Sequence, residues 1–180
     1  MELCVRKLSK SYDGRAVLEN VSFTAPVGLT RIAGNSGIGK TTLLRILLGL
    51  ERADGGEVAP KNLRWAAVFQ EDRLLEGLDA EGNLRFVLGA AYDDSHTKAL
   101  LGALGLGDVG GKKVCDYSGG MKRRLALARA LLAPCDALAL DEPFTGLDRA
   151  SRDAALGDVL RAADEKIVLL AAHEALALPA

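Results

Sequence analysis

The segment "GNSGIGKTTLL", Gly34–Leu44, decides the fold class. It places three glycines and one lysine between a short apolar run and a leucine-rich stretch. Glycine loses more backbone freedom on folding than any other residue, so a bound ligand is the first candidate to offset this loss. The segment fits the pattern G-x-x-x-x-G-K-[ST], in which backbone N–H groups surround phosphate oxygens. The sequence therefore predicts a phosphate-binding loop between a buried strand and a helix.

Each part of this loop has an expected contact with a nucleotide. Lys40 would reach the β- and γ-phosphates, the Thr41 hydroxyl would bind Mg²⁺, and the positive end of the following helix would attract the anion. The residues expected to contact the nucleotide here are Asn35, Ser36, Gly37, Ile38, Gly39, Lys40, Thr41 and Thr42. The alternative is a glycine-rich turn that binds nothing.

A second segment, "ALALDEP", supplies two carboxylates after a short apolar run. The run lies between Pro134 and Pro143, which suits a buried parallel strand. Ligands of open α/β sheets bind at the carboxyl ends of the strands, where Asp141 and Glu142 would lie. Asp141 would hold Mg²⁺, directly or through water, and Glu142 would polarise the attacking water. Alone, such a pair could equally be carboxylates that start a helix; beside the phosphate loop it indicates nucleotide hydrolysis.

Composition limits the class of protein. The chain has 180 residues, enough for one domain with a small insertion, and its net charge of −1 disfavours a protein built mainly to hold nucleic acid. Cys4, Cys115 and Cys135 are scattered and are expected to be free thiols in a reducing compartment. No secretory leader is recognised, and the apolar runs fall short of the roughly 20 residues that cross a bilayer. We therefore expect a soluble protein whose membrane role would need a partner.

The order of expected elements predicts an α/β layered fold with a mainly parallel sheet. Asp13-Gly14 is a hairpin signal between two N-terminal strands, and Ser118 is a plausible helix N-cap. The expected strands are 3–8, 16–25, 29–33, 63–69, 137–140 and 166–172. The expected helical regions are 40–50, 74–106, 118–132 and 149–164.

Several motifs carry a resemblance to one family. "YSGGMKRRLALARALL", residues 117–132, resembles the L-S-G-G-Q signature of ATP-binding cassette (ABC) ATPases. "LALDEPFTGLD", residues 138–148, matches that family's second Walker motif and D-loop, and "VFQEDRLL", residues 68–75, resembles its Q-loop. The motifs stand in the family's order along nearly the whole chain. The resemblance implies a P-loop NTPase (RecA-like) core at about 1–72 and 136–180, with an N-terminal antiparallel β subdomain, and a compact helical subdomain at about 73–135.

The resemblance also implies roles for residues outside the loop. Tyr12 would stack on adenine, Gln70 would bridge the γ-phosphate site and Mg²⁺, and His173 would hold the γ-phosphate and orient the water at Glu142. Tyr12 could instead be an ordinary strand tyrosine, Gln70 a solvated strand end, and His173 an unremarkable histidine after a strand. His96 is expected at the surface.

The signature implies that two copies work together. Ser118, Gly119 and Gly120 would contact the γ-phosphate bound by the phosphate loop of a second copy, with Asp148 at the interface between the copies. Tyr117 and Met121 depart from the family's leucine and glutamine. The arginines that follow, Arg123, Arg124 and Arg129, are expected on the solvated face of the helix, in ion pairs rather than on nucleic acid.

The functional expectation is an ATP-binding and ATP-hydrolysing subunit that couples ATP-driven dimer closure to import through a membrane transporter. "FQEDRLLEGLDAEGNLRF" resembles importer ATPases of the nitrate, sulfonate and taurine group. Leu74, Leu75 and Glu76 would then belong to the surface that receives the membrane subunit. The resemblance implies ATP and Mg²⁺ as ligands, transmembrane permease subunits and a substrate-binding protein as partners, no nucleic acid, and a place on the cytoplasmic face of the inner membrane.

Two other classes remain open. A soluble cassette ATPase of DNA repair, chromosome structure or translation would share these motifs, but such relatives generally carry coiled coils, zinc insertions or two fused cassettes. A P-loop nucleotide or metabolite kinase would explain Gly34–Thr41 and leave "YSGGM" and His173 without a role.

Overall fold

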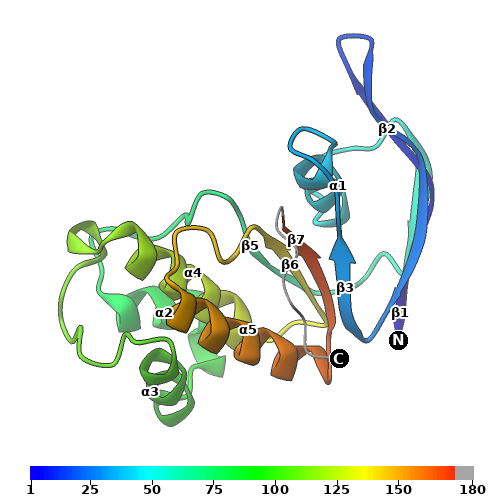
Figure 1. The fold of residues 1–180 in the computed structure, drawn as a ribbon. Helices are drawn as coiled ribbons and strands as arrows, with labels where there is room; N and C mark the ends of the chain where they lie inside the picture. The colour runs from blue at the N-terminus through cyan, green and yellow to red at the C-terminus, as the bar shows by residue number, and fades with distance from the viewer. Residues whose placement is uncertain (173–180) are drawn as a thin grey trace.

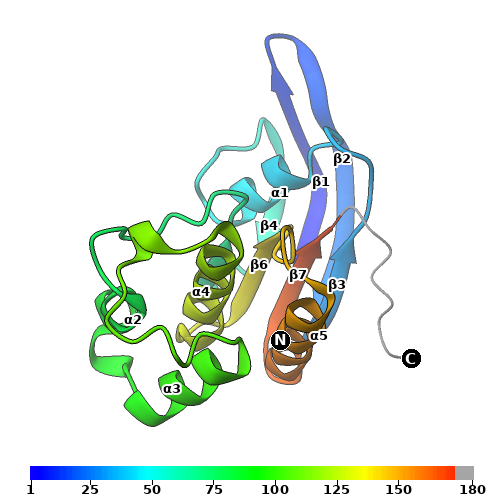
Figure 2. The ribbon, with the colours of Figure 1, turned by 60° about the vertical axis from the view of Figure 1, so that its left-hand side comes forward.

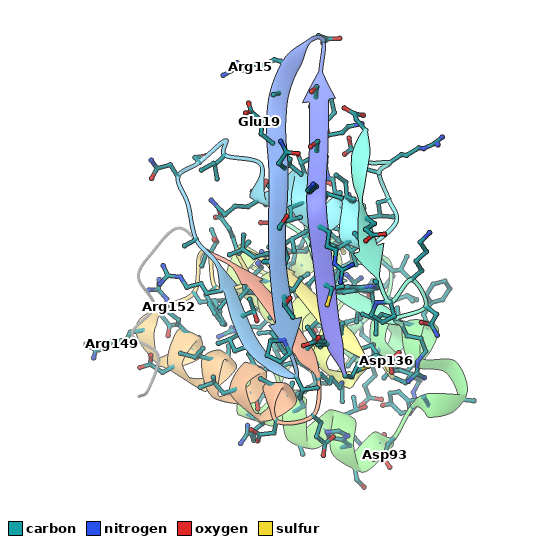
Figure 3. The ribbon with its side chains drawn as sticks, turned by 90° about the vertical axis from the view of Figure 1, so that its right-hand side faces the viewer. Arg15, Glu19, Asp93, Asp136, Arg149 and Arg152 are labelled. Atoms are coloured by element: carbon teal, nitrogen blue, oxygen red, sulfur yellow. The ribbon has the colours of Figure 1, made fainter. Side chains whose placement is uncertain are left out.

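The computed structural model describes residues 1–172, so His173 lies outside the described residues. An antiparallel sheet of order β2-β1-β4 is built from β1 (Glu2–Tyr12), β2 (Arg15–Pro26) and β4 (Gly55–Ala59). The turn between β1 and β2 uses Asp13 and Gly14, both with positive φ, which the predicted Asp-Gly hairpin requires. The hairpin projects from the molecule, and Arg15 and Glu19 extend from its far end (Figure 3).

A parallel sheet of order β3-β7-β6-β5 forms the centre of the molecule. Its strands are β3 (Gly28–Ile32), β5 (Trp65–Val68), β6 (Ala137–Asp141) and β7 (Ile167–Ala171). Every residue of β6 and β7 is buried, which explains why both read as continuous apolar runs rather than alternating ones. The predicted α/β fold with a mainly parallel sheet is confirmed.

The helices lie in two groups (Figures 1 and 2). α1 (Lys40–Leu47) lies between the antiparallel sheet and the parallel sheet, and α4 (Gly119–Leu132) and α5 (Arg149–Ala163) cover the opposite side of the parallel sheet. α2 (Ala80–Leu88) and α3 (Asp94–Ala103) gather beside α4, away from the antiparallel sheet. Two 3-10 turns, η1 (Gly89–Ala91) and η2 (Val114–Asp116), follow α2 and precede α4.

The two faces of β6 belong to different hydrophobic cores. Leu138 and Leu140 pack with α4, α5 and the helices beside them, whereas Ala137 and Ala139 pack with α1 and the antiparallel sheet. This division follows from the two-residue period of a strand. The small side chains on one face leave room for α1, so the phosphate loop before α1 is held close to the end of β6.

Some elements differ from the sequence expectation. β4 was not predicted, and the helical region 74–106 is two separate helices with irregular chain before each. α1 ends at Leu47, three residues earlier than predicted, and Gly49 follows with positive φ, as glycines that end helices do. Among residues 1–172, no helix is both long enough and apolar enough to span a bilayer. The division into a core and a helical subdomain stays a prediction.

Candidate functional site

The phosphate loop joins β3 to α1, and its glycines hold conformations that other residues rarely adopt. Gly39 has φ 99°, and a Cβ there would lie 2.9 Å from the Val17 carbonyl oxygen. Gly34 has φ 148°, and a Cβ there would lie 2.8 Å from the Ile38 Cγ2 atom. Backbone conformation therefore favours glycine at both positions, and at Gly39 the nearby backbone leaves no space for a side chain either. α1 begins after Gly39 without a side-chain cap, so its first N–H groups are available to an anion.

Lys40 is buried beneath this loop, with 7% of its surface exposed. Its ammonium donates hydrogen bonds to the carbonyl oxygens of Gly34, at 2.7 Å, and Asn35, at 3.1 Å. A buried ammonium must be hydrogen-bonded, and these two carbonyls meet that need. The positive charge is thereby held at the centre of the loop.

Thr41 and Asp141, both predicted to hold Mg²⁺, are in direct contact. The Thr41 hydroxyl donates to Asp141 Oδ2 at 2.7 Å, which joins residues 100 positions apart. Asp141 is 2% exposed, and its Oδ1 atom is buried without a hydrogen-bond partner. Burial raises the pKa of Asp141 above its ordinary value, and the hydrogen bond from Thr41 opposes this rise. An orphaned carboxylate oxygen beside a hydroxyl suits a small divalent cation that prefers oxygen ligands.

Glu142 follows Asp141 in a conformation that is unusual for a non-glycine residue. Its φ is 50°, in the left-handed region, which costs about 1–3 kcal/mol unless the surroundings enforce it. Its backbone N–H donates to the Ala171 carbonyl at 2.8 Å, and the Thr145 hydroxyl lies 3.4 Å from its Oε2 atom. Such strain is characteristic of functional sites, where a side chain must point in one direction.

Tyr12 stands at the end of β1, and 42% of the residue's surface is exposed. Its hydroxyl is hydrogen-bonded to Glu51, and this bond raises the pKa of Tyr12 above its ordinary value. The Lys10 ammonium lies 5.2 Å from the ring centroid and forms ion pairs with Glu51 and Asp54. The ring is therefore anchored at its edge while part of its surface stays accessible.

One hollow of about 180 Å³ brings many of the predicted residues together. Its lining includes Tyr12, Ser36, Gly37, Gly39, Lys40, Thr41, Thr42, Gln70 and Glu142, with Val17 as an unpredicted member. Asn35 contributes its carbonyl to Lys40, and Ile38 is exposed beside the loop. The roles of all these residues stay predictions.

The predicted signature residues do not line this hollow. Ser118 caps α4 by accepting a hydrogen bond from the Met121 N–H at 3.3 Å, as its sequence position predicted. Ser118 and Gly119 are exposed at the start of α4, and Gly120 is half-buried. Tyr117 points the other way: it is buried in the core around α4, and burial raises the pKa of its hydroxyl. Tyr117 is therefore a packing residue, and the residues after it remain accessible.

The predicted D-loop residue Asp148 is the N-cap of α5. Its carboxylate accepts from the Ser151 N–H at 2.8 Å and from the Ser151 hydroxyl at 3.1 Å, and these bonds lower the pKa of Asp148. Arg124 donates to the same hydroxyl at 2.8 Å. A polar chain thus links α4 to the start of α5.

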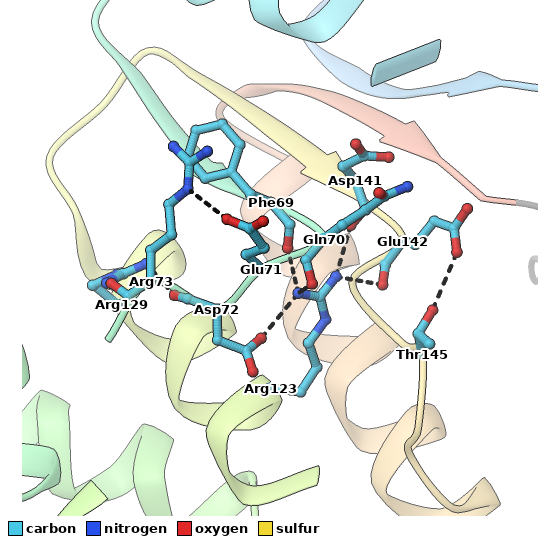
Figure 4. Close-up of polar contacts among 10 residues, drawn as sticks. All are labelled: Phe69, Gln70, Glu71, Asp72, Arg73, Arg123, Arg129, Asp141, Glu142 and Thr145. Atoms are coloured by element: carbon cyan, nitrogen blue, oxygen red, sulfur yellow. Dashed lines mark hydrogen bonds and ion pairs between the residues drawn. The ribbon is translucent and has the colours of Figure 1, made fainter. Parts of the chain in front are cut away.

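The expectation that Arg123 lies on a solvated helix face is wrong. Arg123 is 4% exposed, and its guanidinium contacts the residues that follow β5 and the end of β6 (Figure 4). The helical periodicity contains the signal for this burial. Leu127 and Ala130, four and seven residues after Arg123, are apolar and lie on the same, buried face of the helix. Consecutive arginines obscured the pattern.

The fold, with a phosphate loop after the first strand of a parallel sheet, is that of a P-loop NTPase. The sequence profile of the ABC transporter family matches residues 18–145. The chain belongs to this family.

Curated relatives carry closely related names. The chain is 39% identical over 154 residues to the aliphatic sulfonates import ATP-binding protein SsuB 1 of Paracoccus denitrificans, covering 83% of this chain and 63% of that protein. It is 38% identical over 181 residues to the protein of the same name in Xanthomonas axonopodis pv. citri, covering 92% and 72%. A relative in Rhizobium johnstonii is covered to 57% of its length. The chain thus spans little more than half of some relatives that it matches.

Solved structures agree with the fold. A protein from Pyrococcus furiosus is similar with a TM-score of 0.87 and 26% identity, covering 98% of this chain and 94% of that one. An ATP-binding subunit of an ABC transporter gives a TM-score of 0.83 and 25% identity, covering 96% and 80%.

Proposed function

We propose that this chain is the ATP-binding and ATP-hydrolysing subunit of an ABC membrane importer. The observation that carries the proposal is the hydrogen bond from Thr41, which lines the hollow together with Lys40 and Glu142, to the buried carboxylate of Asp141. Hydroxyl, carboxylate and ammonium groups gathered at a glycine-rich loop suit a magnesium-bound triphosphate. The names of the relatives support import rather than the soluble alternative.

Thr41 and Asp141 would hold Mg²⁺, with the side-chain oxygen of Gln70 as a further ligand. The unpaired Asp141 Oδ1 atom fits this role, since a bound cation would satisfy it. When bound, Mg²⁺ neutralises negative charge on the β- and γ-phosphate oxygens.

The chain's own groups would position the triphosphate. Lys40 would exchange its bonds to the Gly34 and Asn35 carbonyls for bonds to the β- and γ-phosphates. The N–H groups at the start of α1 would bind phosphate oxygens. Tyr12 would stack on the adenine ring, and Glu142 would accept a hydrogen bond from the attacking water and orient it.

A second copy of the chain would complete the site. Ser118 and Gly119 are exposed at the start of α4, where a hydroxyl and backbone N–H groups can meet an anion. They would contact the γ-phosphate held by the other copy, with Asp148 at the interface. Closure with ATP and opening after hydrolysis require that ATP binds the closed pair more tightly than the open one.

A membrane partner would dock beside the Gln70 loop. Large apolar side chains are exposed along the segment into α2, namely Leu75, Leu78, Phe86 and Val87. Phe86 is 71% exposed, an unfavourable state for an aromatic ring unless a partner covers it. Permease subunits, a substrate-binding protein and a place on the cytoplasmic face of the inner membrane complete the proposal.

The test is Glu142→Gln. It keeps the size of the side chain and removes the charge that orients water, so ATP hydrolysis should fall at least about 100-fold. ATP binding should persist, and a dimer should accumulate with ATP in size-exclusion chromatography. Glu57→Gln, an exposed change on β4, is the control. An unchanged turnover rate in Glu142→Gln would remove Glu142 from its role.

Purification from native membranes separates the remaining classes. Co-purification of a polytopic permease supports the importer, whereas recovery of ribosomes or DNA complexes supports the soluble alternative. Transfer of the γ-phosphate to an added acceptor, rather than its release as inorganic phosphate, would identify a kinase.

A further inference from the structure

The buried guanidinium of Arg123 joins two segments at the edge of the candidate site. Its Nη2 atom donates to the carbonyl oxygens of Asp141, at 2.7 Å, and Glu142, at 2.6 Å. Its Nη1 atom donates to the Phe69 carbonyl, to the Gln70 carbonyl at 3.4 Å, and to Asp72 Oδ1 at 3.0 Å. Figure 4 shows the guanidinium between the residues that follow β5 and those that end β6.

Burying a guanidinium is unfavourable unless its N–H groups are satisfied. The ion pair with Asp72 and four carbonyl oxygens meet this demand for the two terminal nitrogens of Arg123. Two of those carbonyls belong to Asp141 and Glu142, whose side chains the proposed function uses. Only the planar guanidinium of arginine can donate to this many acceptors at once, so lysine could not replace it here.

The strained backbone at Glu142 explains why such a clamp matters. The Glu142 N–H donates to the Ala171 carbonyl, and the Glu142 carbonyl accepts from Arg123 at 2.6 Å and from the Thr145 N–H at 3.2 Å. Without Arg123, the carbonyl would keep only the longer bond from Thr145, so the strained backbone that directs the Glu142 carboxylate would be held less firmly.

We propose that Arg123 is a positioning residue that ties the Gln70–Asp72 loop to the backbone of Asp141 and Glu142. Arg123 thereby fixes the backbone that carries the Glu142 carboxylate, and this bond stays in place when the loop loses other contacts. The inference rests on the proposed function for its effect on hydrolysis, but the tie between the two segments is measurable without it.

Arg129 offers a matched comparison on the same helix. It donates to the carbonyl oxygens of Asp72, at 2.9 Å, and Arg73. It therefore holds the same loop with the same charge, but no hydrogen bond joins it to Asp141 or Glu142 in the described part of the chain. Arg129→Gln therefore removes contacts with the loop and leaves in place the bonds of Arg123 to the backbone of Asp141 and Glu142.

The first measurement compares the hydrolysis kinetics of Arg123→Lys and Arg129→Gln in the full chain. Lysine keeps the charge but cannot form the fork, so kcat should fall about 10- to 100-fold, as expected for a misplaced catalytic group. KM for ATP should stay within about twofold, since Arg123 does not line the hollow. Arg129→Gln should change kcat less than about threefold, because the Glu142 backbone keeps its bond. Equal kcat in Arg123→Lys and the parent would overturn the proposal.

The second measurement is backbone hydrogen exchange by mass spectrometry, which needs no ATP hydrolysis. Arg123→Lys should speed exchange in residues 66–74 and 138–147 together, whereas Arg129→Gln should affect 66–74 alone. If Arg123→Lys fails to fold, Arg123→Gln replaces it, because the shorter neutral amide leaves no buried positive charge and cannot bond both segments at once. Exchange unchanged in 138–147 contradicts the tie, even if hydrolysis falls.

The two proposals fail differently. A parent chain that releases no phosphate from ATP defeats the proposed function, and the exchange pattern still decides whether Arg123 joins the two segments.

Discussion

The starts of α1 and α4 are both suited to anions, yet they are built in opposite ways. α1 begins after Gly39 with no side-chain cap, and the buried Lys40 ammonium lies within its loop. α4 begins after Ser118, whose own hydroxyl caps the helix, and its first residues are exposed. The start of α1 is enclosed by one chain, whereas the start of α4 offers its groups outward. The difference teaches that, on the proposed function, a single chain would hold one prepared phosphate site and half of another.

The largest effect is expected at the start of α1. Lys40→Ala removes the ammonium that would bond two phosphates, so the Kd for ATP should rise roughly 100-fold or more. Titration with a fluorescent ATP analogue measures this Kd. Lys61→Ala, which removes an exposed lysine between β4 and β5, is the control and should leave the Kd unchanged. Similar affinities in both variants would mean that α1 is not the primary site.

A smaller and different effect is expected at the start of α4. Gly119→Glu places a carboxylate where the γ-phosphate of a second copy would lie, and no atom lies within 4 Å of the new Cβ position. Two like charges about 5 Å apart repel by about 3 kcal/mol at an effective dielectric constant of about 20, so hydrolysis should fall at least about 10-fold. Binding of ATP to one chain should change less than about twofold, since the hollow is untouched.

Gly119→Gln is the control for this change, because it adds the same bulk without charge. Light scattering with ATP should show fewer dimers for Gly119→Glu than for Gly119→Gln. Equal dimerisation of the two variants, or a lost affinity for ATP in Gly119→Glu, would erase the distinction between the two helix starts.

The smallest effect is expected at the start of α5, where the carboxylate of Asp148 caps the helix. Hydrogen bonds from Ser151 lower the pKa of Asp148, so its charged form stabilises the fold above the ordinary carboxylate pKa near 3.9. This contribution is lost as the pH falls through the lowered pKa. Asp148→Asn keeps a cap without titrating, so the Tm difference between parent and variant should shrink below about pH 4. Circular dichroism melts from pH 7 to 3 measure it, and a difference that stays constant would exclude this role.

Local motifs made much of the structure predictable. The glycine-rich loop, the Asp13-Gly14 turn and the Ser118 cap each depend on a few neighbouring residues, and the structure has the turn and the cap where the sequence indicated them. The buried strand before Asp141 was predictable because prolines bracket a short apolar run.

Features that depend on distant parts of the chain were missed. β4 begins with two glycines and reads as a turn, yet it pairs with β1, and a Cβ on Gly56 would lie 2.5 Å from the Lys7 carbonyl oxygen. Arg123 looks like its neighbours Lys122 and Arg124, and only Asp72 and the carbonyl groups beyond β5 and at the end of β6 make its burial favourable. The strand that pairs with β4 and the carbonyl groups that bind Arg123 both lie far from these residues in the sequence.

The two carbonyls that hold Lys40 have a consequence for the speed of nucleotide capture. On the proposed function, an arriving triphosphate would meet an ammonium that already has internal partners, so its capture would be an exchange of bonds and not a simple addition. Weakening the hydrogen bonds of Lys40 to the Gly34 and Asn35 carbonyls would therefore quicken the exchange, because the ammonium would have fewer partners that compete with the phosphates. The loop would then slow the association of ATP, an effect that a measured Kd for ATP does not separate from the strength of binding.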